Sequence, residues 1–217
     1  MLKLLDIFFP KVCGVCKKIC NEYICKKCEI KLQKYEYFQK NLRSSKNSYD
    51  ELISPFFYSK QIRKLILEYK FKEQIYLYKT ISKILINNQK TVEKISKYDT
   101  IIAVPISNKR FKERGYNQTY LIAKEIACIL QKDIVNDVII KSKNTLPQST
   151  MNIEQRQKNI IGAYETRENE NASKYVTNKN VLIIDDVYTT GSTVNEVCKT
   201  LSKLHPKYMG VLAISKD

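Results

Sequence analysis

The stretch VLIIDDVYTTGST, residues 181–193, constrains the fold of this chain more than any other feature. Its apolar start is typical of a buried strand in a parallel sheet, and two acids, Asp185 and Asp186, follow at once. Ligands of open α/β sheets bind outside the carboxyl ends of the strands. Backbone N–H groups and hydroxyls at the start of the next helix favour a phosphate. The stretch therefore predicts a sugar-phosphate pocket, with ribose at the acids and phosphate at Thr189, Thr190, Gly191, Ser192 and Thr193.

Other interpretations of this stretch explain less of it. A structural strand followed by a capped helix accounts for residues 181–184 and for a cap at Ser192 or Thr193, but not for two adjacent acids. A nucleotide triphosphatase needs a glycine followed by lysine in its phosphate loop, and none of the five glycines has one. The single histidine, His205, excludes a zinc deaminase, whose motif begins with His-x-Glu.

Residues 181–193 resemble the motif with which type I phosphoribosyltransferases bind phosphoribosyl pyrophosphate (PRPP). Two further motifs, VPISNKRFKERGYNQTYLIAKEIA at 104–127 and LPQSTMNIEQRQKNIIGAY at 146–164, resemble the ComF/GntX family, as does the cysteine-rich start. The resemblance covers most of the chain. It implies an α/β fold of the type I phosphoribosyltransferase class, a parallel sheet flanked by helices. It also implies that Asp185 and Asp186 hold the 2′- and 3′-hydroxyls of the ribose, with Mg²⁺ bound together with PRPP.

The same resemblance assigns further residues to the site. In the family, the loop at 105–115 would meet the pyrophosphate, which makes Lys109, Arg110 and Arg114 candidates, and a guanidinium can grip phosphate oxygens with two parallel bonds. The family signature RG-[FY]-NQ corresponds to residues 114–118, although Asn117 is also expected to cap a helix at 118–131. The insertion at 141–161 would be a hood over the acceptor, or simply a surface loop. The hood and substrate candidates are Gln118, Gln148, Arg156 and Asn159.

Five of the seven cysteines lie between residues 13 and 28, as two Cys-x-x-Cys pairs with Cys20 between them. No export signal is apparent, and a cytosolic setting disfavours disulfides and favours a metal. A redox pair would need one Cys-x-x-Cys beside a βαβ pattern, whereas two pairs supply the four ligands that structural zinc prefers. We therefore predict zinc bound by Cys13, Cys16, Cys25 and Cys28. The remaining two, Cys128 and Cys198, are expected in the core.

The chain has a formal net charge of +16, and only six of its 38 basic residues are arginines. An AT-rich genome could produce such a lysine excess without any partner. Residues 1–46 nevertheless contain eleven basic residues against four acids, interleaved with aromatic residues. Cations with aromatic side chains suit single-stranded nucleic acid, because its backbone follows positive charge and its bases stack.

The order of elements indicates two parts. Residues 1–45 would form a zinc-binding module with a docking helix at 1–9 and a polar helix at 31–40, and residues 50–217 would form the phosphoribosyltransferase-like domain. In that domain we expect loops at 105–115 and 167–180. The expected strands are 52–58, 100–104, 134–140, 181–184 and 208–214, and the expected helices are 62–69, 75–86, 118–131 and 193–204.

Two functions follow from these observations. The family resemblance implies a DNA-handling protein of natural competence, which binds incoming single-stranded DNA in the cytoplasm and PRPP in its pocket. It would work in the cytoplasm or at the inner face of the membrane, beside the competence machinery. The alternative is an orphan phosphoribosyltransferase of nucleotide salvage or metabolism. The sequence leaves open whether the protein is an enzyme, because no base that would activate an acceptor is evident and a fold does not fix a function.

Overall fold

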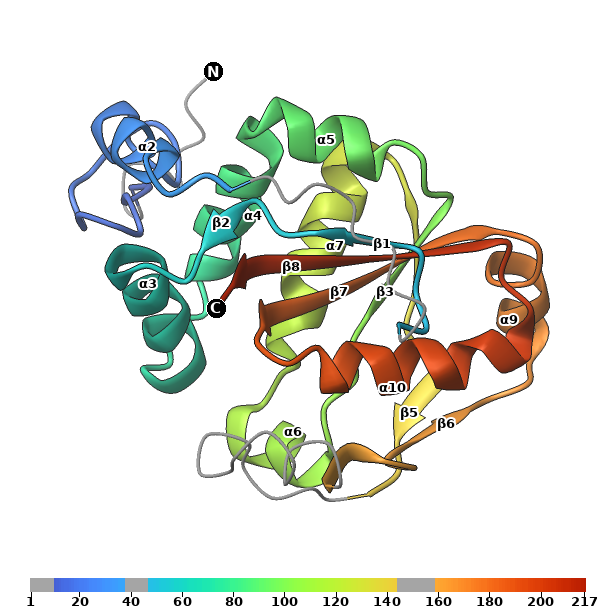
Figure 1. Ribbon diagram of the computed structural model, residues 1–217. Coiled ribbons are helices and arrows are strands. Elements are labelled where there is room, and N and C mark those ends of the chain that lie inside the picture. The colour runs from blue at the N-terminus through green and yellow to red at the C-terminus, as the bar shows by residue number, and fades with distance from the viewer. Residues whose placement is uncertain (1–9, 38–46, 144–158) are drawn as a thin grey trace.

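A computed structural model describes residues 10–37, 47–143 and 159–217 (Figure 1). Its centre is a parallel sheet in the order β1-β8-β7-β3-β4, with β2 also paired to β8. The longest pairing joins β7 and β8, and a separate antiparallel pair is formed by β5 and β6. The strands are β1 (Glu51–Ile53), β2 (Phe56–Phe57), β3 (Thr100–Ala103), β4 (Asp133–Val135), β5 (Ile139–Lys141), β6 (Tyr164–Thr166), β7 (Asn180–Tyr188) and β8 (Tyr208–Lys216).

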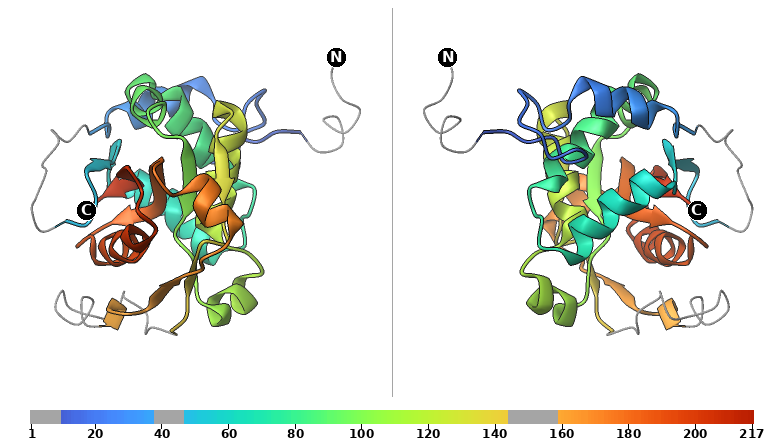
Figure 2. Two further views of the ribbon diagram at one scale, coloured as in Figure 1. Left: turned by 90° about the vertical axis from the view of Figure 1, so that its right-hand side faces the viewer. Right: turned by 90° about the vertical axis from the view of Figure 1, so that its left-hand side faces the viewer.

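Helices cover both faces of the sheet (Figures 1 and 2). Alternate residues of β7 point to opposite sides, since Leu182 and Ile184 belong to one buried cluster and Val181 and Ile183 to the other. The first cluster contains α3 (Lys60–Phe71), α4 (Leu77–Asn87), α5 (Gln89–Ile95) and α7 (Gln118–Leu130). The second contains α9 (Glu170–Tyr175), α10 (Ser192–Leu201) and the short helix η2 (Ser202–Leu204). A strand apolar on both faces is what residues 181–184 predicted.

Several boundaries differ from the sequence-based expectation. The strand expected at 52–58 is split into β1 and β2 at Pro55, which has no N–H to donate to a neighbouring strand. The strand expected at 134–140 is two strands in different sheets, β4 and β5. The expected loops contain helices, α6 (Asn108–Arg114) in the first and α9 in the second. Strand β7 does not end at Ile184 but continues through both acids to Tyr188, because β8 pairs with it throughout.

The cysteine-rich segment packs on the same core as the sheet. Its helix is α2 (Lys26–Gln33), which begins before the expected helix at 31–40. Cys13, Ile24 and Cys28 are buried in the cluster that contains α4, and the hydroxyl of Thr80 in α4 donates to the Tyr23 carbonyl at 2.8 Å. The described part of the module is thus continuous with the main core. The expected docking helix at 1–9 lies outside the described residues.

Two expectations about buried cysteines have different outcomes. Cys198 is buried in α10, as expected, but Cys128 is exposed. The buried face of α7 runs through Ile122, Ala123 and Ile126, and Cys128 faces away from it. Among the described residues, no helix has the length and apolar character needed to cross a membrane.

Gly210 in β8 generates a test of the sheet. A side chain at this position would collide with the ring of Tyr98, whose hydroxyl donates to the buried Glu51 carboxylate at 3.0 Å. Glycine in a strand ordinarily costs stability relative to alanine. We expect Gly210→Ala instead to lower the free energy of unfolding by about 1–3 kcal/mol, as overpacking does. Chemical denaturation measures this, and in a Tyr98→Ala background the cost should disappear. Equal cost in both backgrounds would contradict this account.

Candidate functional site

A cleft of about 380 Å³ opens at the carboxyl ends of β3 and β7. It lies where the parallel-sheet rule places a ligand site. Most of the residues predicted for the site line this cleft. Lys109 does not line it and is exposed to solvent on α6. The predicted residues in the lining are Asp185, Asp186, Thr189, Thr190, Gly191, Ser192, Thr193, Arg110, Arg114 and Gln118.

The two acids lie in the second half of β7, and both are half-buried in the cleft. Asp185 accepts from the backbone N–H of Asp186 at 2.8 Å, and Asp186 accepts from that of Val187 at 2.6 Å. Lys70, at the end of α3, forms an ion pair with Asp186 at 2.5 Å. Desolvation and the neighbouring charge of Asp186 raise the pKa of Asp185 to about 7. One carboxyl of the pair is thus ion-paired with Lys70, and the other titrates near neutrality.

The loop between β7 and α10 is shaped by Gly191. Its φ is +73°, and a side chain there would collide with the ring of Tyr188. Tyr188 is fixed in turn by a hydrogen bond between its hydroxyl and that of Tyr49 at 2.8 Å. The Thr190 and Ser192 hydroxyls lie 2.7 Å apart at the start of α10. The loop thus brings its hydroxyl groups and the start of α10 to the lining of the cleft, the features from which the sequence predicted a phosphate site.

The opposite wall is formed by α6 and the start of α7. Arg110 and Arg114 are four residues apart on α6, so they lie on one face of it. Desolvation and the charge of Arg110 lower the pKa of Arg114, which donates to the Gln118 side-chain oxygen at 2.9 Å. Asn117 caps α7, as expected, by accepting from the Thr119 N–H at 3.0 Å, and it donates to the Val104 carbonyl. The signature at 114–118 therefore ties α6, α7 and the end of β3 together.

Gln118 lines the cleft, and only 3% of its surface is exposed. Its side-chain Nε2 is buried without a hydrogen-bond partner among the described residues. A buried donor left unpaired is costly. The arrangement suits a bound molecule that supplies an acceptor oxygen at this point.

The lining also contains residues that were not predicted from the sequence, among them Lys70, Lys141 and Tyr164. Desolvation and nearby Arg110 lower the pKa of Lys141 to about 8, and its ammonium lies 5.4 Å from the Tyr164 ring centroid. These residues come from α3, β5 and β6, which the chain brings together only on folding. In a lysine-rich chain, no local signal distinguishes Lys70 or Lys141 from the others.

The hood candidates are described only in part. Gln148 and Arg156 lie outside the described residues. Asn159 is described but is not among the residues lining the cleft, and it directly precedes Ile160, which is buried against the second core cluster. The pair β5 and β6 flanks the insertion on both sides.

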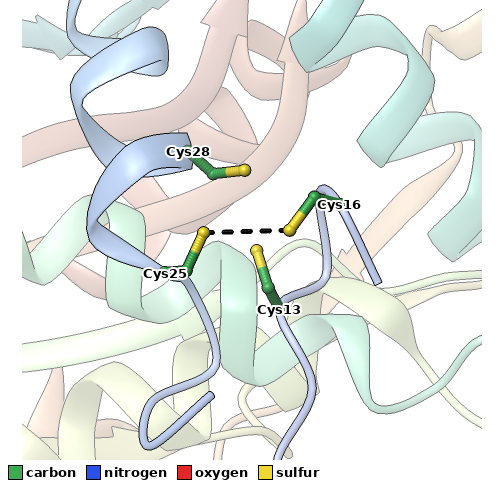
Figure 3. A group of neighbouring side chains, drawn as sticks. All are labelled: Cys13, Cys16, Cys25 and Cys28. Atoms are coloured by element: carbon green, nitrogen blue, oxygen red, sulfur yellow. Dashed lines mark hydrogen bonds between the residues drawn. The ribbon is translucent and has the colours of Figure 1, made fainter. Parts of the chain in front are cut away.

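The four predicted cysteine ligands converge (Figure 3). The sulfur atoms of Cys13, Cys16, Cys25 and Cys28 all lie within 4.8 Å of one another, and those of Cys16 and Cys25 are 3.8 Å apart. Two thiolates on a tetrahedral zinc, each bound at ~2.3 Å, lie about 3.8 Å apart. Cys20 points elsewhere, since its sulfur contacts the Glu22 carbonyl. The cluster therefore fits a structural metal such as zinc.

The thiols of this cluster differ in acidity. Burial opposes ionisation of Cys13, but hydrogen bonds from the backbone of Cys16 and Cys25 prevail and lower its pKa to about 7. Burial raises the pKa of Cys28. The Cys13 thiol is thus prepared to ionise, while a cation would be needed to ionise Cys28, as metal binding does.

Comparison with known proteins finds a matching domain and a relative that spans most of the chain. A family model described as the phosphoribosyl transferase domain matches residues 116–215, which include the acids, the loop and α7. The chain is 27% identical over 209 residues to Competence protein F of Haemophilus influenzae, and the alignment covers 94% of this chain and 90% of that protein.

Solved structures of lower similarity include two phosphoribosyltransferases. The purine phosphoribosyltransferase from Pyrococcus horikoshii is 16% identical with a TM-score of 0.38, covering 64% of this chain and 82% of that chain. The adenine phosphoribosyltransferase from Thermoanaerobacter pseudethanolicus is 15% identical with a TM-score of 0.39, covering 67% of this chain and 83% of that chain.

The fold prediction is therefore confirmed, and the comparisons fit the ComF-type family that the sequence motifs indicated. The parallel sheet flanked by helices, with an acid pair and a hydroxyl loop at its edge, is the type I phosphoribosyltransferase fold, and its matched domain includes the whole β7–α10 segment. The relative at 27% identity extends the similarity to nearly the full chain, including the cysteine-rich start. The chain is thus similar over nearly its full length to Competence protein F, and residues 116–215 match the phosphoribosyl transferase domain.

Proposed function

We propose that this protein is a DNA-handling protein of natural competence that binds PRPP in the cleft and single-stranded DNA on its basic surface. The observation on which the proposal rests is the convergence of an acid pair, a hydroxyl loop and two arginines in one cleft. These are the groups that a ribose, a 5′-phosphate and a pyrophosphate each require. The similarity to Competence protein F supports the biological process.

In this proposal the ribose 5-phosphate and the pyrophosphate of PRPP bind to opposite walls of the cleft. Asp185 and Asp186 accept hydrogen bonds from the ribose 2′- and 3′-hydroxyls, and the loop at 189–193 binds the 5′-phosphate. Arg110 and Arg114 bind the pyrophosphate, with Lys109 further out on α6. Gln118 satisfies its buried Nε2 on an oxygen of the ligand.

Mg²⁺ fits this cleft as a companion of the ligand rather than as a protein-bound ion. Among the described residues, the one group of three or more metal-ligating side chains is the cysteine cluster. Mg²⁺ is commonly bound through one or two carboxylates and substrate phosphates, a number that Asp185 and Asp186 can supply. When bound, the ion neutralises charge on the pyrophosphate.

The proposed nucleic-acid role rests on charge and on the cysteine module. The net charge of +16 favours an anionic polymer, and the counterions released from the strand provide the driving force. We propose that the metal is zinc and that it has a structural role. The protein would receive the strand in the cytoplasm, next to the competence machinery at the inner face of the membrane.

An alternative function, an orphan phosphoribosyltransferase of nucleotide salvage, is favoured by one observation. The pKa of Asp185 is raised to about 7, so at neutral pH about half of this carboxyl population can accept a proton. An acceptor nitrogen would bond to the ribose carbon as the bond to pyrophosphate breaks, and its proton would pass to Asp185. This supplies the base that the sequence did not reveal.

Asp186→Asn tests the PRPP site. We expect PRPP, in the presence of Mg²⁺, to bind at least about tenfold more weakly, because hydrogen bonds to a charged group contribute about 1.5–3 kcal/mol. Calorimetry measures the affinity. The matched control is Asp133→Asn, at the exposed start of β4 and thus at the opposite edge of the sheet. Unchanged affinity in a folded Asp186→Asn protein would refute the assignment of the acid pair.

Metal analysis tests the cysteine cluster. We expect one zinc per chain, lost when Cys25 and Cys28 are both replaced by serine, with lower thermal stability because Cys28 belongs to the main core. Cys20→Ser and Cys128→Ser serve as controls and should retain the metal. A native protein that is folded without any metal would contradict the zinc assignment.

Fluorescence anisotropy of a labelled single-stranded oligonucleotide separates the two functions. We expect binding that weakens steeply with salt and changes when PRPP and Mg²⁺ are added, since coupling between two ligands is reciprocal. Weak binding that is indifferent to PRPP, together with pyrophosphate release from PRPP in a panel of nucleobases, would favour the salvage enzyme instead.

A further inference from the structure

Helix α6 is the most exposed of the elements around the cleft. None of its residues, Asn108–Arg114, is buried, although it stands beside the sheet edge where the site lies (Figure 1). It contains four basic residues and one acid. Among the described residues, none of the four cations has an acidic partner within ion-pair distance. A short helix is not stable in isolation, and α6 has no buried residue that would stabilise it by packing.

The two faces of α6 differ in what they meet. Arg110 and Arg114 line the cleft, whereas Lys109, Phe111 and Lys112 are exposed to solvent. Phe111 has 51% of its surface exposed. Phe111 stands between Arg110 and Lys112 and belongs to neither buried cluster. It is a surface for an apolar or aromatic partner.

A second exposed aromatic residue lies nearby, across the mouth of the cleft. Phe71, the last residue of α3, has 66% of its surface exposed and lines the cleft. The Arg114 guanidinium lies 5.4 Å from the centre of its ring, and Arg114 is one helical turn from Phe111. Phe111 is three residues before Arg114 on α6, so the Arg114 guanidinium lies between the helix that carries Phe111 and the ring of Phe71.

The described aromatic residues of the cysteine module are engaged within the protein. The Tyr23 ring is contacted by the ammonium groups of Lys11 at 5.7 Å and Lys79 at 4.8 Å. Tyr35 packs against the core, and the Tyr37 ring centre lies 4.2 Å from that of Phe57. The described part of the module offers exposed lysines, but its aromatic rings are already in contact with neighbouring residues.

We propose that single-stranded DNA stacks its bases on Phe111 and Phe71 and runs its phosphates along Lys109 and Lys112, across the mouth of the cleft. This inference rests on the proposed function and locates its nucleic-acid interface. Bases stacked on aromatic faces beside a basic track are the general mode of single-strand binding, and Arg114 adds a cation–π contribution. A duplex would have no free base faces to stack, so the arrangement selects for a single strand. Binding of an acidic peptide is an outcome of the test rather than a second proposal.

This placement explains how PRPP and DNA would influence one another. Arg110 and Arg114 on the cleft face of α6 would meet the pyrophosphate, while the outer face of the same short helix meets the strand. A ligand that fixes α6 on one side changes the position of Phe111 and Lys112 on the other. Coupling therefore needs no change elsewhere in the protein.

The test compares matched aromatic and lysine variants by anisotropy with a labelled poly-thymidine oligonucleotide. We expect Phe71→Ala with Phe111→Ala to weaken binding about 25-fold, about fivefold for each stacking platform, which is the low end of measured stacking effects. The control is Phe57→Ala, which is likewise 51% exposed but lies on β2, and it should bind within twofold of the wild type. Lys112→Gln should lower the slope of log affinity against log salt by about 0.7, the value for one phosphate contact on a single strand.

Hydrogen exchange gives an independent readout, which does not depend on how a variant folds. In the wild-type protein, the oligonucleotide should slow exchange in residues 106–115, and poly-glutamate of equal charge should not. If the wild type does not bind the oligonucleotide, the proposed function itself fails. A second outcome is that the wild type and the aromatic double variant bind the oligonucleotide equally well, with protection at 26–34 instead of 106–115. That outcome overturns this inference while the proposed function stands. Equal protection of α6 by poly-glutamate would also overturn it, in favour of an acidic peptide.

Discussion

The unequal lengths of three neighbouring strands determine the whole site. Strand β3 stops where Ala103 pairs with Ile184, whereas β7 continues beside β8 as far as Tyr188 and Lys216. Asp185 to Tyr188 therefore have a strand on one side and none on the other. The space left by β3 is the cleft, and residues 104–118 turn away to form its far wall. Without the long β7–β8 pairing, the acids would belong to a flexible loop and not to a rigid extended strand.

The side chains that line the cleft carry more positive than negative charge, which favours an anionic ligand. Three carboxyl groups line the cleft, those of Glu113, Asp185 and Asp186, and Asp186 is restrained by Lys70. The lining holds four cations, Lys70, Lys141, Arg110 and Arg114. Desolvation lowers the pKa of Lys141 and of Arg114, so in the free protein these cations are poorly compensated. A phosphorylated ligand relieves that cost, because it supplies the negative charge that the wall lacks. The cleft is thus better matched to a sugar phosphate than to a neutral sugar.

The sequence could predict the parts of the site that are local and not those that arise from folding. Strand, acids and loop follow one another in thirteen residues, and the cysteine pairs repeat one short spacing, so both could be identified. Lys70 and Tyr164 reach the cleft from distant segments, which no short pattern connects. Helix α6 was expected as a loop because it has no buried face, and amphipathic periodicity is the signal by which a helix is recognised. Cys128 was misplaced because an apolar stripe in the sequence was broader than the face that α7 buries.

The cysteine module is better understood as a support of the cleft than as an appendage. Lys17, in the turn between the first two cysteines and the rest of the module, forms an ion pair with Glu68 of α3 at 3.2 Å and a hydrogen bond with Gln74 at 2.8 Å. Two residues after Glu68, Lys70 holds Asp186, and Phe71 stacks on Arg114. The last turn of α3 therefore contacts the module through Glu68 and the two walls of the cleft through Lys70 and Phe71. The cysteine cluster and the acid pair are thus linked through one turn of α3, and a metal bound at the cluster would also restrain this turn.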